Sequence, residues 1–186
     1  YCTFLFTDLR GFTSMSEKMT PEEVAEIMNT TLTVQVEEIQ RSGGMVDKFI
    51  GDACMGIFSA PLDLAQHENR AVEAAVRIQE RIKKLNEIME PEIAIGVGLQ
   101  SGWACVGNMG SSTRFDYTAI GNCVNEAARY ESSTKEVGVD IIIGHETAQN
   151  CKYLLKELDP IRVKGKQNKL RVFTWGSNLL SSPPAY

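Results

Sequence analysis

The sequence predicts an α/β (α+β) domain with a ferredoxin-like βαββαβ core and a C-terminal α/β extension. Three observations predict this fold: a short apolar strand that begins the chain, an apolar hairpin over 45–58, and a strictly alternating strand over 92–101. Helical periodicity separates the first strand from the hairpin, and the hairpin from the alternating strand. Strands and helices in this order are typical of the ferredoxin-like arrangement.

The first strand is expected over Cys2–Thr7, and the acidic residue Asp8 follows it directly. A polar, glycine-containing loop or short helical turn comes next. Thr20 and Pro21 then begin a helix, because Thr is a good N-cap and Pro suits the first helical position. Apolar residues at helical spacing continue this helix to about Gln40.

Two apolar strands, Met45–Ile50 and Ala53–Phe58, are joined by Gly51 and Asp52. A two-residue Gly-Asp link between such runs is typical of a tight hairpin, since Gly supplies the positive φ that primed turns need. The turn places one carboxylate at the tip of the hairpin. A turn Asp more often only caps its own backbone. Together with Asp8, however, it predicts a site for a hard cation and a phosphate-bearing substrate.

A long helix is expected from about Leu64 to Ile88, with Asp63 as its N-cap. The strand Glu92–Ser101 follows, with apolar side chains on one face. Its other face carries only small residues in its centre, which indicates that another element packs closely there. These small residues are Ala94, Gly96 and Gly98.

The second half of the chain is expected to contain shorter elements. Strands at Trp103–Asn108 and Phe115–Ile120 are connected by a flexible loop, Gly107–Ser112, and a helix begins at Gly121 or Asn122. The remaining expected elements are a buried strand at Asp140–Ile143, a helical turn at His145–Asn150, strands at Tyr153–Leu158, Ile161–Lys164 and Leu170–Trp175, and a basic loop at Lys164–Gln167. We expect one domain over 1–175 and a disordered tail over 176–186.

Composition restricts the classes of partner. The formal net charge of −5 over 186 residues gives no electrostatic reason to expect nucleic acid or an anionic membrane surface, so a polyanionic substrate needs local cations or metal ions. No run is apolar and long enough to span a bilayer. The five cysteines lack CxxC spacing, which favours free thiols in a reducing cytoplasm. The chain enters a strand without an initial Met, and we expect regulatory parts upstream in a longer protein.

The candidate catalytic residues begin with the two strand-end aspartates. If the strands of Asp8 and Asp52 are neighbours, both carboxylates project from one edge of the sheet and can share two Mg²⁺ ions roughly 3.5–4 Å apart. Gly11 is expected to let a triphosphate approach the backbone closely. Lys48 points either to solvent or into a cleft beside Asp52.

Two further groups carry positive charge. Asn125 and Arg129 stand at i and i+4 on one face of a helix, and Arg is suited to bidentate phosphate contact. Taken alone, such a pair is more often a helix-surface hydrogen bond. Lys164 and Lys166 flank a glycine and either hold phosphates or form a solvated turn.

Taken together, four motifs in order resemble the class III nucleotide cyclase catalytic domain, with the closest match to bacterial homodimeric adenylyl cyclases. They are FTDLRGFT (6–13), KFIGDACMGIF (48–58), the run GNMGSSTRFDYTAIGNCVNEAAR (107–129) and VKGK (163–166). The resemblance covers about 1–175. It implies conversion of ATP to 3′,5′-cyclic AMP and pyrophosphate with two divalent metal ions, Mg²⁺ or Mn²⁺. It also implies a head-to-tail homodimer in which each site takes its metal half and its NxxxR half from different protomers.

The resemblance assigns roles residue by residue. Asp8 and Asp52 match the metal-binding aspartates, and Leu9 matches the residue whose carbonyl joins them. The positions matched to phosphate contacts are Gly11, Phe12, Thr13 and Lys164, with Arg114 as a further candidate.

The other matched positions read the base and stabilise the transition state. Lys48 and Thr118 match the base-reading pair, and Lys with Asp or Thr goes with ATP in this family. Asn125 and Arg129 match the NxxxR pair that orients the ribose and neutralises charge on the α-phosphate. Glu126 departs from the apolar residue usual at its position, and Trp103 is unusual in its strand pair.

Three alternatives are open. A guanylyl cyclase is disfavoured by Lys48 and Thr118, because Glu with Cys goes with GTP. A cyclic-dinucleotide synthase is expected to carry a GG(D/E)EF turn, which the sequence around Gly51 lacks. A catalytically silent dimerisation domain typically loses a metal-binding Asp or the Arg, and both are present here.

Overall fold

The computed structural model describes residues 1–176, which form a seven-stranded sheet in the order β2-β3-β1-β4-β7-β9-β8 and a separate β5-β6 hairpin. The expected tail therefore lies, from residue 177 on, outside the described residues. β1 (Cys2–Leu9) pairs antiparallel with β3 (Ala53–Phe58) on one side and with β4 (Ile95–Gly102) on the other. β2 (Met45–Ile50) pairs with β3. This order confirms the predicted ferredoxin-like core.

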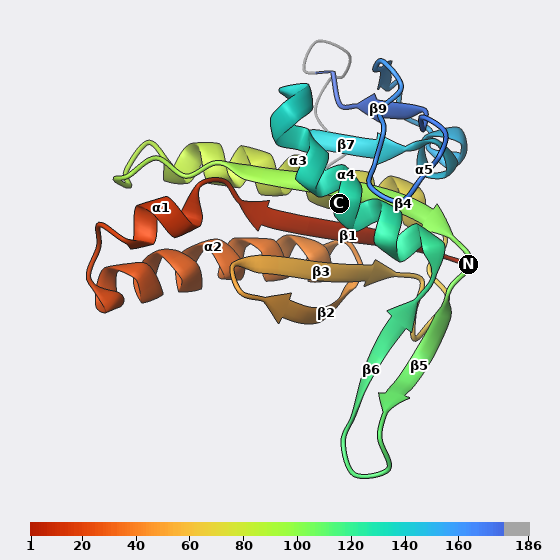
Figure 1. Cartoon of the computed structure of the whole chain (residues 1–186), viewed down its shortest axis with the longest axis horizontal. Coiled ribbons are helices and arrows are strands. Elements are labelled where there is room, and N and C mark those ends of the chain that lie inside the picture. Colours follow the sequence, from red (N-terminus) through yellow and green to blue (C-terminus); the bar gives the residue numbers. More distant parts are fainter. Residues whose placement is uncertain (177–186) are drawn as a thin grey trace.

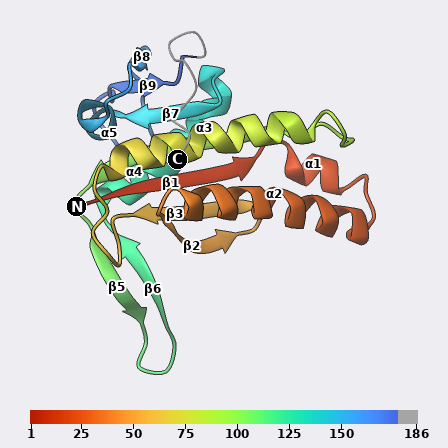
Figure 2. The ribbon, with the colours of Figure 1, turned by 180° about the vertical axis from the view of Figure 1, so that it is seen from behind.

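Helices cover the two faces of the sheet unequally. α2 (Pro21–Arg41) and α3 (His67–Leu85) lie side by side on one face, as the view from behind shows (Figure 2). α4 (Asn122–Val137) crosses the other face over β1 and β4 (Figure 1). Alternate residues of β1 serve the two sides: Leu5 packs with α2 and α3, whereas Phe4 packs with α4. The β2–β3 hairpin extends beyond α4, so its face on that side is uncovered (Figure 1).

The N-terminal elements follow the sequence rules. Thr20 caps α2 through a capping box, in which its side chain accepts from the Glu23 N–H and the Glu23 side chain accepts from the Thr20 N–H. The loop after β1 contains the short helix α1 (Phe12–Ser16). Gly51 adopts a positive φ of 63° in the turn between β2 and β3, as expected for a tight hairpin.

The predicted start of the long helix was wrong. α3 begins at His67, and its N-cap is Gln66 rather than Asp63. Leu64 is held in a loop, because its N–H donates to Ser59 Oγ at 3.2 Å and its side chain packs into the core. The helix ends at Leu85, before the predicted Ile88.

The turn glycines led to a wrong prediction beyond β4. β5 (Cys105–Gly110) runs through the segment expected to be a flexible loop, and it pairs along its length with β6 (Phe115–Ile120). The real turn is shorter, and the Ser111 N–H closes it by donating to the Arg114 carbonyl at 2.8 Å. The expected strand at Glu92–Ser101 is paired only from Ile95, as β4. We refer to residues 105–120 as the arm, because this hairpin projects from the body (Figure 1).

The C-terminal extension contains fewer paired residues than expected. β7 (Ile141–Gly144) lies parallel to β4 and is followed by α5 (His145–Asn150). The three strands predicted beyond it are shorter in the structure. They are reduced to β8 (Lys156–Glu157), a single bridge between Ile161 and Leu170, and β9 (Val172–Thr174). Pro160, which has no N–H to donate, and the turn at Gly165 interrupt the pairing.

Two sequence-based expectations concern the chain as a whole. All five cysteines are free thiols, and three of them are buried. Within residues 1–176, no helix has both the length and the apolar composition needed to cross a membrane.

Candidate active site

Asp8 and Asp52 lie next to each other. The β1–β3 ladder pairs Thr7 with Cys54, so the end of β1 and the turn of the β2–β3 hairpin reach the same end of the sheet (Figure 1). The pKa of Asp8 is raised from an ordinary value of 3.8 to about 6. Burial contributes most to this shift, followed by the negative charge of Asp52 and a hydrogen bond between the two side chains. The pair therefore retains a proton at pH values where an isolated Asp is fully ionised.

The backbone beside Asp8 is fixed by Arg10. Its N–H donates to the Ala94 carbonyl at 2.8 Å, and its Nη2 donates to the Val139 carbonyl at 2.6 Å. Its Nη1 lies 3.1 Å from Asp140 Oδ1. These contacts tie the end of β1 to the turn that follows α4.

The loop matched to the phosphates begins at Gly11. This residue has a positive φ of 69° and starts α1, so the backbone itself requires glycine there. Phe12 is half-buried against the core, whereas Thr13 is exposed. Leu9 is buried, and its backbone N–H donates to the Asp8 carboxylate and lowers the pKa of that group.

Glu131 is a third carboxylate that the sequence did not single out. It projects from α4 toward β4, where a Cβ added to Gly96 would lie 2.6 Å from its Oε1. Its pKa is raised to about 7, first by burial and then by the charge of Asp8, with a smaller contribution from Asp52. The small residues of β4 predicted that an element packs closely there. Only the register of α4 on the sheet shows that it brings a carboxylate toward Asp8.

The donor set at this edge fits a hard divalent cation. Asp8 and Asp52 are carboxylates in contact, and the charge of Asp52 and a hydrogen bond between the two side chains help to raise the pKa of Asp8. Within residues 1–176, no group of three or more His, Cys, Asp or Glu side chains is placed to hold a metal ion. Mg²⁺ is commonly held by one or two carboxylates together with substrate phosphates, so two aspartates are sufficient.

The base-reading candidates, Lys48 and Thr118, both contact Asp47, a residue that was not predicted from the sequence. The β2–β3 register shifts between Val46 and Lys48, which makes Asp47 the extra residue of a bulge. Thr118 Oγ1 donates to Asp47 Oδ2 at 2.5 Å. Lys48 Nζ lies 3.9 Å from Asp47 Oδ1. The only sign in the sequence is a pair of polar residues at successive positions of an apolar strand.

The NxxxR pair and the basic loop form another group. Asn125 is exposed and Arg129 half-buried on the outer side of α4. The 163–166 loop lies across this helix, because a Cβ added to Gly165 would be 3.3 Å from Arg129 Nη2. Lys164 is exposed on this loop and directly precedes Gly165.

One chain does not bring all the predicted residues to one place. Arg129 and Glu131 are two positions apart on α4 and therefore face different directions. Arg129 faces the 163–166 loop, whereas Glu131 faces Asp8 and Asp52. Arg114 stands in the exposed turn of the arm. The predicted residues thus form an aspartate group, a base-reading group and an Arg129 group on one chain.

Glu126, the residue that departs from the usual pattern, holds the 163–166 loop. It is 7% exposed, and Lys166 Nζ lies 2.7 Å from its Oε1. Gln100 Nε2 donates to its Oε2 at 2.8 Å, and Asn122 Nδ2 donates to its Oε1 at 2.7 Å. Burial alone would raise the pKa of Glu126, but the hydrogen bonds from Lys166, Gln100 and Asn122 lower it.

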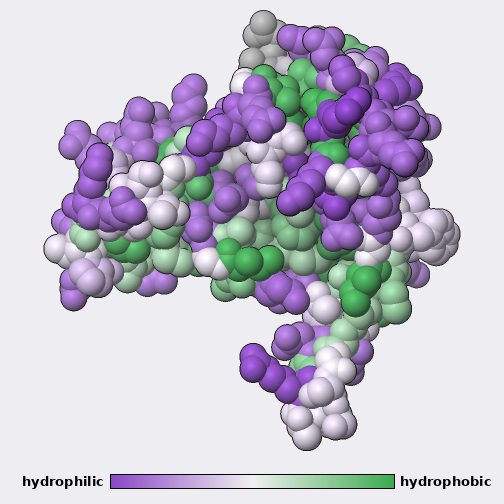
Figure 3. All heavy atoms as spheres, viewed as in Figure 1, coloured by the Kyte–Doolittle hydropathy of each residue, from purple (hydrophilic) through white to green (hydrophobic). Residues whose placement is uncertain are grey.

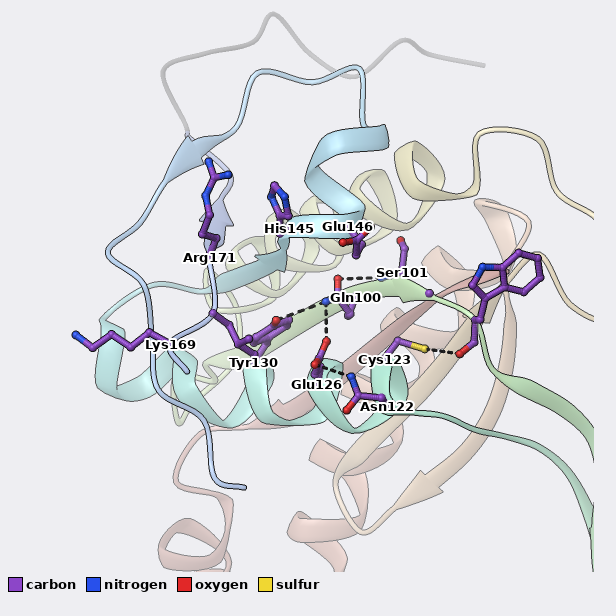
Figure 4. A pocket seen from close by; sticks show the side chains of 13 residues that line it. Gln100, Ser101, Asn122, Cys123, Glu126, Tyr130, His145, Glu146, Lys169 and Arg171 are labelled. Atoms are coloured by element: carbon purple, nitrogen blue, oxygen red, sulfur yellow. Dashed lines mark hydrogen bonds between the residues drawn. The ribbon is translucent and has the colours of Figure 1, made fainter. Parts of the chain in front are cut away.

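Figure 4 shows Gln100, Asn122 and Glu126 at the floor of a cavity of about 450 Å³ beside α4. Tyr130, also in the floor, is 1% exposed, and His145 and Arg171 stand on the opposite wall (Figure 4). Trp103 lies at the rim, 81% exposed, with its ring 5.6 Å from that of Tyr1. The aspartate pair is not part of this cavity. Glu126 and Tyr130 of α4 form part of its floor.

Comparison with known proteins gives a consistent result. The family model described as "Adenylate and Guanylate cyclase catalytic domain" matches residues 1–176. An adenylate cyclase from Anabaena cylindrica is 35% identical over 185 residues, which cover 92% of this chain and 36% of that protein. The chain therefore spans about a third of the length of that relative.

Two solved structures overlay closely on this fold. The adenylyl cyclase CyaB from P. aeruginosa has a TM-score of 0.85 at 31% identity, covering 98% of this chain and 94% of that one. A guanylyl cyclase also has a TM-score of 0.85, at 30% identity, covering 96% of this chain and 95% of that one. The fold therefore matches an adenylyl cyclase and a guanylyl cyclase equally well.

Proposed function

The chain belongs to the class III nucleotide cyclase catalytic domains, and from this premise we propose that it converts ATP to 3′,5′-cyclic AMP and pyrophosphate. Two observations support adenine as the base. Lys48 is a cation that can donate to adenine N1, and Thr118 is a hydroxyl that can accept from the 6-amino group. Both contact the same buried carboxylate, Asp47. We assign ATP as the substrate because Lys48 and Thr118 meet at this carboxylate.

The remaining residues have roles that their positions support. Divalent cations at Asp8 and Asp52 would neutralise phosphate charge and lower the pKa of the attacking ribose 3′-hydroxyl. The chain itself supplies Arg129, whose guanidinium can take up charge on the α-phosphate, and Asn125, which can orient the ribose. Lys164 can hold the terminal phosphates from its loop. None of these side chains is placed as an obvious general base.

We further propose that the active form is a head-to-tail homodimer. Within one chain Arg129 faces away from the aspartates, so a complete site needs the second copy. Large apolar side chains are exposed where a partner can cover them, and Figure 3 shows apolar atoms over β2 and β3 and where β6 joins the body. The exposed apolar residues include Phe49 (50% exposed) and Ile50 (56%) on β2, and Phe115 (60%) and Ile120 (63%) at the two ends of β6.

The setting of the domain is also a proposal. Five free thiols and a nucleotide triphosphate substrate fit a cytoplasmic location. The length of the Anabaena relative leaves room for regulatory domains in the whole protein.

The proposed function is tested by incubating the purified domain with ATP or GTP and Mg²⁺ or Mn²⁺, followed by identification of the products. We expect cyclic AMP and pyrophosphate in equal amounts, with ATP preferred over GTP. Cyclic GMP as the main product would favour the guanylyl cyclase alternative. The similarity of this fold to a guanylyl cyclase structure is the reason for testing it. No cyclic product with either nucleotide would favour a silent dimerisation domain.

Glu126→Gln is expected to raise the KM for ATP by about tenfold with little change in kcat, because a charged hydrogen bond is worth roughly 1.5 kcal/mol. The substitution removes the charge that holds Lys166, and so loosens the loop that carries Lys164. Steady-state kinetics of the two proteins measure this effect. Glu157→Gln is a matched control, since it breaks the exposed pair with Arg171 and should change neither constant. A fall in kcat at unchanged KM would contradict the role of Glu126 in holding the loop.

A further inference from the structure

Asp47 is a buried carboxylate between the two base-reading side chains. Its side chain is 1% exposed, so it is shielded from solvent and from direct contact with a nucleotide. Its Oδ2 accepts the Thr118 hydroxyl at 2.5 Å. Its Oδ1 is buried, has no hydrogen-bond partner, and lies 3.9 Å from Lys48 Nζ.

The contact with Asp47 determines what Thr118 offers to a ligand. A threonine hydroxyl has one proton to donate and two lone pairs that can accept. An ionised carboxylate can only accept. Because the Thr118 proton is directed to Asp47 Oδ2, only lone pairs of the hydroxyl remain for a ligand.

The second oxygen acts on Lys48 in a complementary way. The negative charge of Asp47 Oδ1 attracts the ammonium group of Lys48. The bulge at Asp47 therefore brings Lys48 and Thr118 to the same carboxylate. The result is a donor and an acceptor side by side. This is the complement of an adenine edge, which presents N1 as an acceptor and the 6-amino group as a donor.

We propose that Asp47 is a positioning residue that sets the specificity for a 6-aminopurine by making Thr118 an obligate acceptor and by holding Lys48 beside it. This inference rests on the proposed cyclase function and deepens it. A 6-oxopurine, as in guanine or hypoxanthine, presents an acceptor to the lone pairs of Thr118 and is rejected, because two acceptors are left facing each other. Asp47 exerts this effect without touching the substrate.

A purely structural role explains the site less well. Burying a carboxylate is costly unless its oxygens are paired, and here one oxygen has no hydrogen-bond partner. An amide of the same shape would fill the same space at lower cost. The charge itself therefore has a use, and the use that the neighbours indicate is to direct the Thr118 proton.

The experiment compares ATP with inosine triphosphate, which differs at positions 1 and 6 of the purine but lacks the 2-amino group of GTP. We measure kcat/KM for both nucleotides with wild-type protein and with Asp47→Asn, an isosteric change. The Asn side-chain NH₂ can donate to Thr118, which frees the hydroxyl proton for a 6-oxo group. We expect the preference for ATP to fall by at least about tenfold, through a higher KM for ATP and a lower KM for inosine triphosphate.

Two further substitutions separate this role from a general weakening of the fold. Thr118→Val removes the hydroxyl at nearly the same shape, and adding Asp47→Asn to it should lower the ATP preference no further, since the two residues act through one hydrogen bond. Asp116→Asn is the matched control: it lies two residues away on β6, is exposed, and should leave the preference unchanged. Displacement of a fluorescent ATP analogue provides the same comparison at equilibrium.

The outcomes are distinguishable. Equal losses for both nucleotides in Asp47→Asn, with an unchanged ratio, would overturn the role of Asp47 while leaving the cyclase assignment intact. Additive effects of Asp47→Asn and Thr118→Val on the ratio would also overturn it. A wild-type protein that makes no cyclic product from any purine triphosphate would instead overturn the proposed function itself.

Discussion

Mixing the Arg129→Ala protein with the Asp52→Ala protein is expected to restore cyclase activity that neither protein shows alone. Each substitution removes one half of every site in a homodimer, so each protein by itself should lose at least about a hundredfold in kcat. A mixed dimer retains one site with both halves intact. Because half of the dimers in an equal mixture are mixed, and each has one of two sites, activity should recover to about a quarter of the wild-type value.

The matched control mixes Asp8→Ala with Asp52→Ala. The two aspartates contact each other, so both substitutions damage the same half and no combination of these chains contains an intact pair. We expect no recovery in that mixture at any ratio of the two proteins. Recovery in both mixtures, or in neither, would rule out a site shared between two chains. Cyclic AMP formation is measured against the mixing ratio at fixed total protein concentration.

Asp52→Asn is expected to abolish metal-dependent activity and, in the metal-free protein, to raise the thermal stability at pH 7. Activity should fall by at least about a hundredfold, because an amide oxygen is a poorer ligand for a hard cation than a carboxylate. Stability should rise because the substitution removes a negative charge that contacts Asp8. A variant that loses activity and gains stability indicates that the two carboxylates are kept together for function at a cost in stability.

The pH dependence of stability follows from the raised pKa of Asp8. Its value of about 6 in the folded protein lies above its ordinary value of 3.8, so the folded state holds a proton that the unfolded chain has released. The metal-free protein therefore loses stability as the pH rises from about 4 to about 6, since folding binds protons in this window. The gap in Tm between Asp52→Asn and wild type should open over the same window.

Calorimetric scans with and without Mn²⁺ measure both effects. Mn²⁺ should raise the Tm of wild type more at pH 7 than at pH 5, because the shared proton must leave before the pair binds a cation. It should have little effect on Asp52→Asn. Asp159→Asn, at an exposed position, is the control and should behave as wild type. An Asp52→Asn protein less stable than wild type at pH 7 would contradict repulsion between the two carboxylates.

Most of the fold could be predicted because its signals are local. The N-cap at Thr20 and the positive φ of Gly51 depend on a few successive residues, and both occur as expected. The wrong predictions concern element boundaries that are set by contacts between residues distant in sequence. Leu64 is drawn into the core and delays α3, and pairing with β6 extends β5 through a glycine-rich run.

The sequence by itself determined which chemical groups this protein possesses and the order of its core elements, because side-chain chemistry and periodicity are properties of the chain. It was sufficient to predict that Asp8 and Asp52 meet, since neighbouring strands place them at one edge. Only the tertiary structure decided that Glu131 faces this pair, that Glu126 anchors Lys166, and that a bulge turns Asp47 toward Thr118. Each of these depends on the register between elements distant in sequence, which packing sets and local patterns do not encode.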